Sequence, residues 1–114
     1  MGHIINDTAI AFAWPLKSKK YCDWVWRGGK GYGNYEKALK QVYAGMMDNI
    51  RHRWGPKGAR GASCDLFVGT VLRYSKADPY CTPTLTRQLP HWKKSERFYN
   101  MGHIPFSKCK AGDV

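Results

Sequence analysis

Acidic side chains are scarce in this chain of 114 residues, with 8 Asp and Glu against 19 Lys and Arg. The resulting formal net charge of +11 predicts an anionic partner, because long-range attraction concentrates anions near such a surface. Nucleic acid is one such partner, with Lys and Arg on phosphates and the Trp and Tyr side chains stacking on bases. However, the sequence shows no nucleic-acid fold signature, and its basic residues are scattered over predicted loops.

Cysteines are few and widely spaced. The four of them are separated by 42, 17 and 28 residues and form no Cys-x-x-Cys pair, at Cys22, Cys64, Cys81 and Cys109. Because this spacing is unlike common zinc sites, we predict no metal and no cofactor. The alternative is that the four cysteines pair in two disulfides. A disulfide at Cys64 would exclude that residue as a nucleophile.

A long apolar run is also missing. Near the N-terminus, Asn6 or Asp7 is placed to cap a short helix that Pro15 terminates. This helix is too short and too polar at its flanks for a membrane span or a signal peptide. We therefore expect no membrane span, and synthesis in a reducing cytoplasm.

The segment Gly61-Ala62-Ser63-Cys64-Asp65-Leu66-Phe67-Val68 carries the strongest chemical signal. Ser63 is a good N-cap and apolar residues then recur at helical spacing, which predicts a helix over about 63–75 with Cys64 in its first turn. Free N–H groups and the helix dipole favour a thiolate there. Cys64 is thus a candidate nucleophile, and the backbone N–H groups of Cys64 and Asp65 are candidate oxyanion donors. The alternative is a small buried hydrophobic residue.

These residues resemble the nucleophile motif of the NlpC-type cell-wall peptidases, papain-like cysteine hydrolases that cut the peptide stems of peptidoglycan. In most of that family an Asp precedes the Cys and a Ser follows it, whereas here the two are exchanged. Two later segments follow in the family's order. Pro83-Thr84-Leu85-Thr86-Arg87-Gln88 resembles its Pro-Arg-Thr-x-x-Gln stretch, and Lys110-Ala111-Gly112-Asp113-Val114 resembles its Lys-Pro-Gly-Asp-Val turn.

The resemblance implies a peptidoglycan hydrolase with an anionic wall polymer as a further partner, in a protein that is phage-encoded or exported to the wall. Trp24-Val25-Trp26-Arg27-Gly28-Gly29 is similar to the family's Tyr-x-Trp-Gly-Gly segment, where an aromatic side chain helps to line the site. A basic aromatic loop precedes the nucleophile motif. The expected substrate-binding residues are therefore Trp24, Trp26, Trp54 and Gln88.

The resemblance also places the general-base histidine on a strand beyond the Gly-Asp-Val turn, and no residue of this chain matches it. Of the four histidines, His103 is the stand-in base, because it lies between Gly102 and Ile104 in a predicted extended stretch. We therefore expect an α+β class chain: a single domain, 1–114, forming the front, mostly helical portion of a papain-like fold. Most of the antiparallel sheet would be missing, and activity alone would be weak or absent.

The clearest helical pattern elsewhere runs roughly from Tyr35 to Arg51 after an Asn34 cap. Its apolar stripe consists of Leu39, Val42, Tyr43, Met46 and Ile50. We expect an ordered loop over 16–34, a short helix or turn near Thr84 to Trp92, and an extended segment near Phe98 to Ile104.

Overall fold

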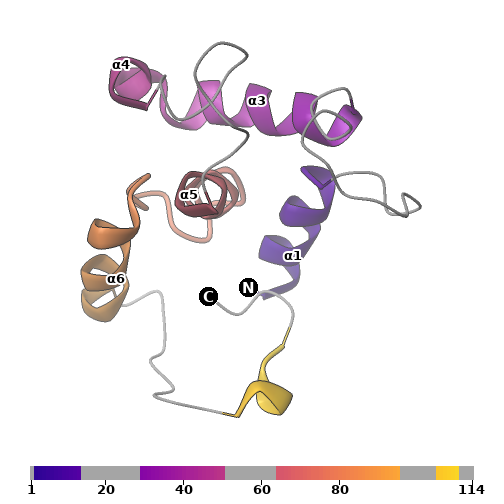
Figure 1. The fold of residues 1–114 in the computed structure, drawn as a ribbon, viewed down its shortest axis with the longest axis vertical. Coiled ribbons are helices and arrows are strands. Elements are labelled where there is room, and N and C mark those ends of the chain that lie inside the picture. The colour runs from indigo at the N-terminus through magenta and orange to yellow at the C-terminus, as the bar shows by residue number, and fades with distance from the viewer. Residues whose placement is uncertain (1, 14–28, 51–63, 96–104, 111–114) are drawn as a thin grey trace.

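The computed structural model describes residues 2–13, 29–50, 64–95 and 105–110, and these ranges are helical with no strand among them (Figure 1). The α-helices are α1 (Gly2–Ala11), α3 (Lys30–Val42), α4 (Met47–Ile50), α5 (Cys64–Tyr74) and α6 (Leu85–Lys94). Two short 3-10 helices are η1 (Ala44–Met46) and η3 (Phe106–Lys108). The prediction of a mostly helical chain is confirmed for these ranges.

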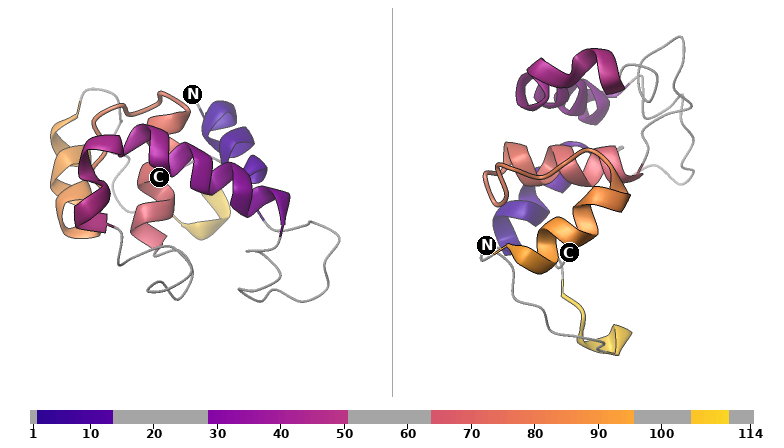
Figure 2. Two further views of the ribbon diagram at one scale, coloured as in Figure 1. Left: turned by 90° about the horizontal axis from the view of Figure 1, so that it is seen from above. Right: turned by 90° about the vertical axis from the view of Figure 1, so that its left-hand side faces the viewer.

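Helix α5 lies at the centre of the arrangement. Figures 1 and 2 show α3 crossing on one side of it, with α1 and α6 flanking it. Its side chains Leu66, Val71 and Leu72 lie on different sides of the helix and are all buried, because α5 has neighbours on several sides. The helix predicted over about 63–75 is confirmed over Cys64–Tyr74.

An aromatic cluster joins the three helices α1, α3 and α5. Phe12 follows α1, Tyr35 lies on α3 and Phe67 on α5, and their ring centroids are 5.4 to 6.2 Å apart. Tilted and edge-on contacts at this range are the arrangements that aromatic rings prefer. Phe12 and Tyr35 are fully buried, so the cluster fixes how α1 and α3 sit against the first half of α5.

The helix expected over Tyr35 to Arg51 begins earlier and is interrupted. It starts at Lys30, and the side chain of Asn34 donates a hydrogen bond of 3.0 Å to the carbonyl oxygen of Ala11 instead of capping. The helix ends at Val42, and η1 and α4 follow. Within the predicted stripe, Leu39, Tyr43 and Ile50 are buried, whereas the side chain of Met46 is exposed. Tyr43, the residue at the interruption, is buried, and its N–H donates a hydrogen bond of 3.0 Å to the carbonyl oxygen of Leu39.

The first helix also differs from its prediction. It begins at Gly2, so Asn6 and Asp7 lie within the helix and do not cap it. The segment near Thr84 to Trp92, expected to be a short helix or turn, is the helix α6, with Thr84 as its N-cap residue. The expected loop over 16–34 is wrong at its end, because α3 begins at Lys30, and its residues 16–28 lie outside the described residues. The extended segment expected at 98–104 lies wholly outside them.

None of the helices in the described ranges combines the length and the apolar character needed to cross a bilayer.

Candidate functional site

Cys64 is the first residue of α5, and its free thiol is exposed. The half-buried Asp65 follows it, and the Leu66 N–H donates a hydrogen bond of 2.9 Å to the Asp65 carboxylate. The first N–H groups of a helix have no partner within the helix, so an acidic side chain in the first turn stabilises this end. The exposed position argues against the alternative of a buried structural cysteine.

Gln88 of α6 reaches the same first turn of α5. Its side-chain Nε2 donates to the carbonyl oxygen of Asp65 at 2.8 Å and to that of Thr82 at 2.7 Å. Since both partners are acceptors, the nitrogen of the amide must face them, and the orientation of the amide is fixed. Gln88 is 1% exposed, and its Oε1 accepts no hydrogen bond within the described part of the chain. Gln88 therefore anchors α6 against the start of α5.

An open cavity of about 390 Å³ lies where α5 begins. Its lining residues come from α5 and α6 and are Cys64, Asp65, Val68, Gln88 and Trp92. The cavity thus brings together three residues that the sequence analysis proposed for one site, from two segments 23 residues apart. Its walls are mainly apolar around the thiol, with a carboxylate and a carboxamide as the polar groups.

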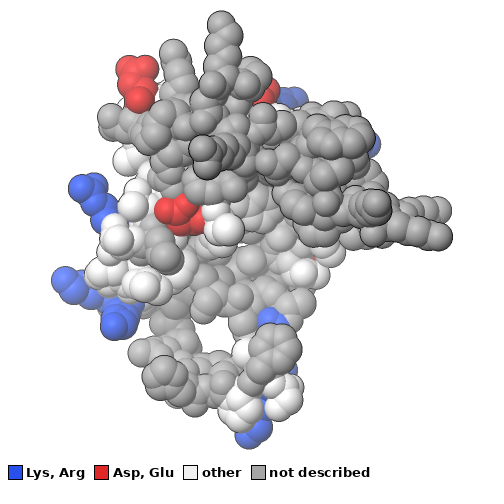
Figure 3. Space-filling view, viewed as in Figure 1, with Lys and Arg blue, Asp and Glu red and all other residues white. Residues whose placement is uncertain are grey.

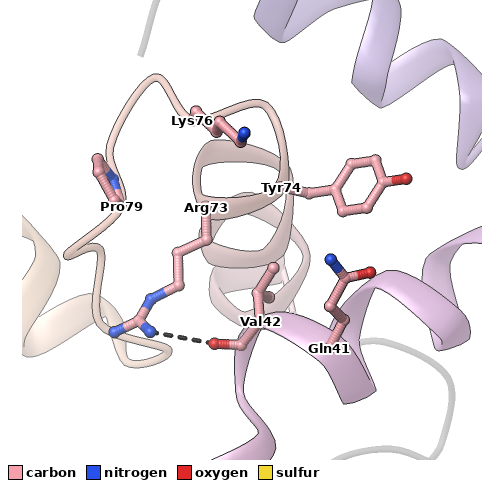
Figure 4. Close-up of a pocket in the computed structure, with 6 residues that line it drawn as sticks. All are labelled: Gln41, Val42, Arg73, Tyr74, Lys76 and Pro79. Atoms are coloured by element: carbon pink, nitrogen blue, oxygen red, sulfur yellow. Dashed lines mark hydrogen bonds between the residues drawn. The ribbon is translucent and has the colours of Figure 1, made fainter.

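A second open cavity, of about 660 Å³, lies at the other end of α5. Figure 4 shows its lining residues, Gln41, Val42, Arg73, Tyr74, Lys76 and Pro79. The Arg73 guanidinium donates from Nη1 to the carbonyl oxygen of Val42 at 3.1 Å and from Nε to that of Cys81 at 2.7 Å. It also lies 4.5 Å from the centroid of the Tyr43 ring. With these contacts Arg73 holds the end of α3 to α5 and to the loop that follows.

Asp78 and His91 form a polar pair that the sequence analysis did not identify. The Asp78 carboxylate is fully buried, and its Oδ2 lies 2.8 Å from Nε2 of His91. Its Oδ1 accepts a hydrogen bond of 3.2 Å from the Tyr80 N–H. A buried carboxylate needs such partners. The available sequence signal was the position of His91 three residues after Gln88, which places both on one side of a helix.

The Asp78–His91 pair is not placed to activate Cys64. The Asp78 N–H donates to the carbonyl oxygen of Leu72, which lies about 12 Å along the α5 axis from Cys64. The imidazole is therefore held near the far half of α5, and it does not line the cavity at the thiol. Through its contact with Asp78, the His91 side chain links α6 to the loop after α5.

Of the three described cysteines, Cys81 differs from the other two. Cys81 is fully buried, and burial, with the nearby Asp78 carboxylate as the second cause, raises the pKa of its thiol to about 12. Cys81 therefore stays protonated and unreactive at neutral pH. Cys64 and Cys109 are exposed, and none of the three is in a disulfide. No group of three or more potential metal ligands occurs among the described side chains.

Four of the proposed site residues lie outside the described residues. These are the expected substrate-binding Trp24, Trp26 and Trp54 and the stand-in base His103. Comparison with family models, with curated proteins and with solved structures gave no match to this chain. The candidate function therefore depends on the geometry around Cys64 and on the motifs.

Proposed function

We propose that the chain is a cysteine peptidase domain of the NlpC type, with a papain-like fold, that hydrolyses peptide bonds of peptidoglycan. The observation that carries the proposal is the position of Cys64, which is exposed at the first residue of α5 and lines an open cavity. The motif resemblance supports the same residue as the nucleophile. Gln88, from the second matching motif, lines that cavity as well.

The proposed chemistry is acyl transfer through a thioester. The Cys64 thiolate attacks the carbonyl carbon of the scissile peptide bond, and the oxyanion that forms is stabilised by backbone N–H groups at the helix start. The tetrahedral intermediate collapses when the C–N bond breaks and the amine leaves with a proton from the base. Water then hydrolyses the thioester and releases the acid and the free thiol.

The base is the one component that no described side chain supplies. His91 is engaged with Asp78, and His103 lies outside the described residues. A papain-like mechanism requires an imidazole within hydrogen-bond reach of the thiol, so turnover depends on this group. For that reason the first test measures the nucleophile separately from turnover.

The test is alkylation of the folded protein by iodoacetamide, with the labelled cysteines located by mass spectrometry. Cys109 is a matched exposed control and Cys81 a buried one. We expect Cys64 to react faster than Cys109 at neutral pH, and Cys81 to react only after unfolding. Equal rates at Cys64 and Cys109 would remove the basis of the nucleophile assignment. Release of peptides from purified cell walls, compared with Cys64→Ala, then measures turnover.

A further inference from the structure

One side of α6 is buried and the opposite side faces solvent. The buried or half-buried side carries Gln88, His91 and Trp92. At 3.6 residues per turn the exposed positions form one continuous arc on the other side. This arc, here called the outer face of α6, consists of Thr86, Arg87, Leu89, Pro90, Lys93 and Lys94.

The outer face carries positive charge without acidic neighbours on its own helix. Arg87, Lys93 and Lys94 form no ion pair with the described residues, in contrast to Lys40, which pairs with Glu36 at 3.5 Å. The sequence of α6 contains no Asp or Glu. Figure 3 shows Lys and Arg side chains gathered along the edge of the molecule that α6 occupies in Figure 1.

The three charges are spread along the helix. Arg87 and Lys94 are separated by about 10 Å of helix rise, and Lys93 lies beside Lys94 on the same arc. Like charges at this spacing repel one another, and binding of a polyanion replaces that repulsion by attraction and releases counterions. A single small anion reaches only part of such a row. The spacing therefore fits a linear polymer with successive phosphates.

We propose that the outer face of α6 docks the phosphodiester backbone of an anionic cell-wall polymer. This inference deepens the proposed function, on which it rests, by naming the surface that holds the domain at the wall. The same helix places Gln88 and Trp92 in the Cys64 cavity. A polymer bound on one side of α6 would therefore be separated from the thiol on the other side by the width of this one helix.

The composition of the outer face favours a wall polymer over single-stranded nucleic acid. Proteins that bind single strands place several aromatic rings beside the cations, so that successive bases stack on them. No aromatic side chain lies on the outer face of α6, since Trp92 is half-buried on the opposite side. The exposed Tyr80, in the loop before α6, is a single ring. A sugar or polyol phosphate chain requires no stacking surface.

The test measures binding of the full chain, carrying Cys64→Ala, to poly(glycerol phosphate) and to a dT oligonucleotide of matched charge across a salt series. The variant Arg87→Gln/Lys93→Gln/Lys94→Gln removes the outer-face charges. The variant Lys30→Gln/Lys37→Gln/Lys108→Gln removes the same charge from exposed positions elsewhere. Circular dichroism verifies that each variant is folded, and single Arg87→Gln and Lys94→Gln variants serve if the triple variant is not.

We expect the outer-face variant to bind poly(glycerol phosphate) about tenfold more weakly, and the slope of log affinity against log salt to fall by roughly 2. The control variant should keep most of the affinity for poly(glycerol phosphate) and most of the salt dependence. Equal losses in the two triple variants, or tighter binding of the oligonucleotide through the outer face, would overturn the proposal. Because the alkylation rate of Cys64 is measured separately, loss of wall binding and loss of the nucleophile assignment are distinguishable.

Discussion

The side-chain amide of Gln88 donates a hydrogen bond of 2.8 Å to the carbonyl oxygen of Asp65, the residue directly after Cys64. This contact joins the two motifs whose resemblance led to the proposed function. The side chain of Gln88 is fully buried, so its main role is to position the start of α5. The start of α5 is held in place from α6, on which the proposed docking face also lies.

Replacing Gln88 by Ala should therefore destabilise the domain. The substitution leaves two partly buried carbonyl oxygens without this donor and opens a void between α5 and α6, at a cost of about 2–4 kcal/mol. Urea denaturation measures the change in the free energy of unfolding. Leu89→Ala on the same helix is the control, because Leu89 is 50% exposed and should change stability by only about 0.5 kcal/mol. Similar losses in the two variants would contradict the assigned role.

The Asp78–His91 contact predicts a second stability effect. His91→Ala removes a partner of a fully buried carboxylate, and we expect a loss of about 2–3 kcal/mol. In the double variant Asp78→Asn/His91→Ala the uncompensated charge is gone, so part of the loss should be recovered. A double-mutant cycle by urea denaturation measures the coupling. Strict additivity of the two substitutions would mean that the pair contributes no coupling energy.

Local patterns in the sequence were sufficient to predict α5 and α6. The apolar pattern of Leu66, Phe67, Val68, Val71 and Leu72 predicts a helix, and three of these side chains, Leu66, Val71 and Leu72, are buried in the structure. Similarly, the presence of Cys64 at the helix start follows from the cap and the glycines that precede it. The candidate site residues Cys64, Asp65 and Gln88 were proposed for one site because the motifs that contain them follow the order of the family that the sequence resembles.

Long-range contacts decided what local patterns could not predict. Asn34 has the side chain of a good cap, yet it bonds to Ala11, 23 residues away, and α3 starts at Lys30. Likewise the carbonyl oxygen of Val42, the last residue of α3, accepts a hydrogen bond from the Arg73 guanidinium, 31 residues away. The contact between Asp78 and His91 also could not be predicted from local patterns. Neither residue belongs to a recognised sequence motif, and only the fold brings the two side chains together.

The buried thiol of Cys81 predicts a loss of stability at alkaline pH. Its pKa is raised from the ordinary value of 9.0 to about 12 in the folded chain, first by burial and then by Asp78. The folded state thus holds the proton more tightly than the unfolded state. The stabilisation is complete below about pH 9 and is lost as the pH rises toward 12, with a slope of about 1.4 kcal/mol per pH unit.

Cys81→Ala is the comparison for this prediction, because lysines and tyrosines titrate in the same range. The difference in the free energy of unfolding between the wild type and the variant should be constant below about pH 9 and should shrink above it. Urea denaturation at a series of pH values measures that difference. A difference independent of pH would show that the thiol ionises equally in both states.

Two glycines on different helices should respond in opposite directions to the same substitution. A methyl group at Gly69 on α5 would meet the Tyr43 hydroxyl, and would lie 3.0 Å from the carbonyl oxygen of Thr82 and 3.3 Å from Nε2 of Gln88. Since Tyr43 and Gln88 hold the loop after α5, Gly69→Ala should cost about 1–3 kcal/mol. At Gly33 on α3 nothing lies within 4 Å, so Gly33→Ala should stabilise the chain by about 0.5–1 kcal/mol.

Urea denaturation of the two variants tests the packing of the Cys64 helix against α6. If Gly69→Ala proved as stable as the wild type, α5 would lie farther from Tyr43 and Gln88 than the structure places it. Gly33→Ala controls for the intrinsic gain that alanine brings to any helix interior. The alkylation rate of Cys64 in Gly69→Ala adds a functional readout, because displacement of Gln88 should alter the first turn of α5 to which it is bonded.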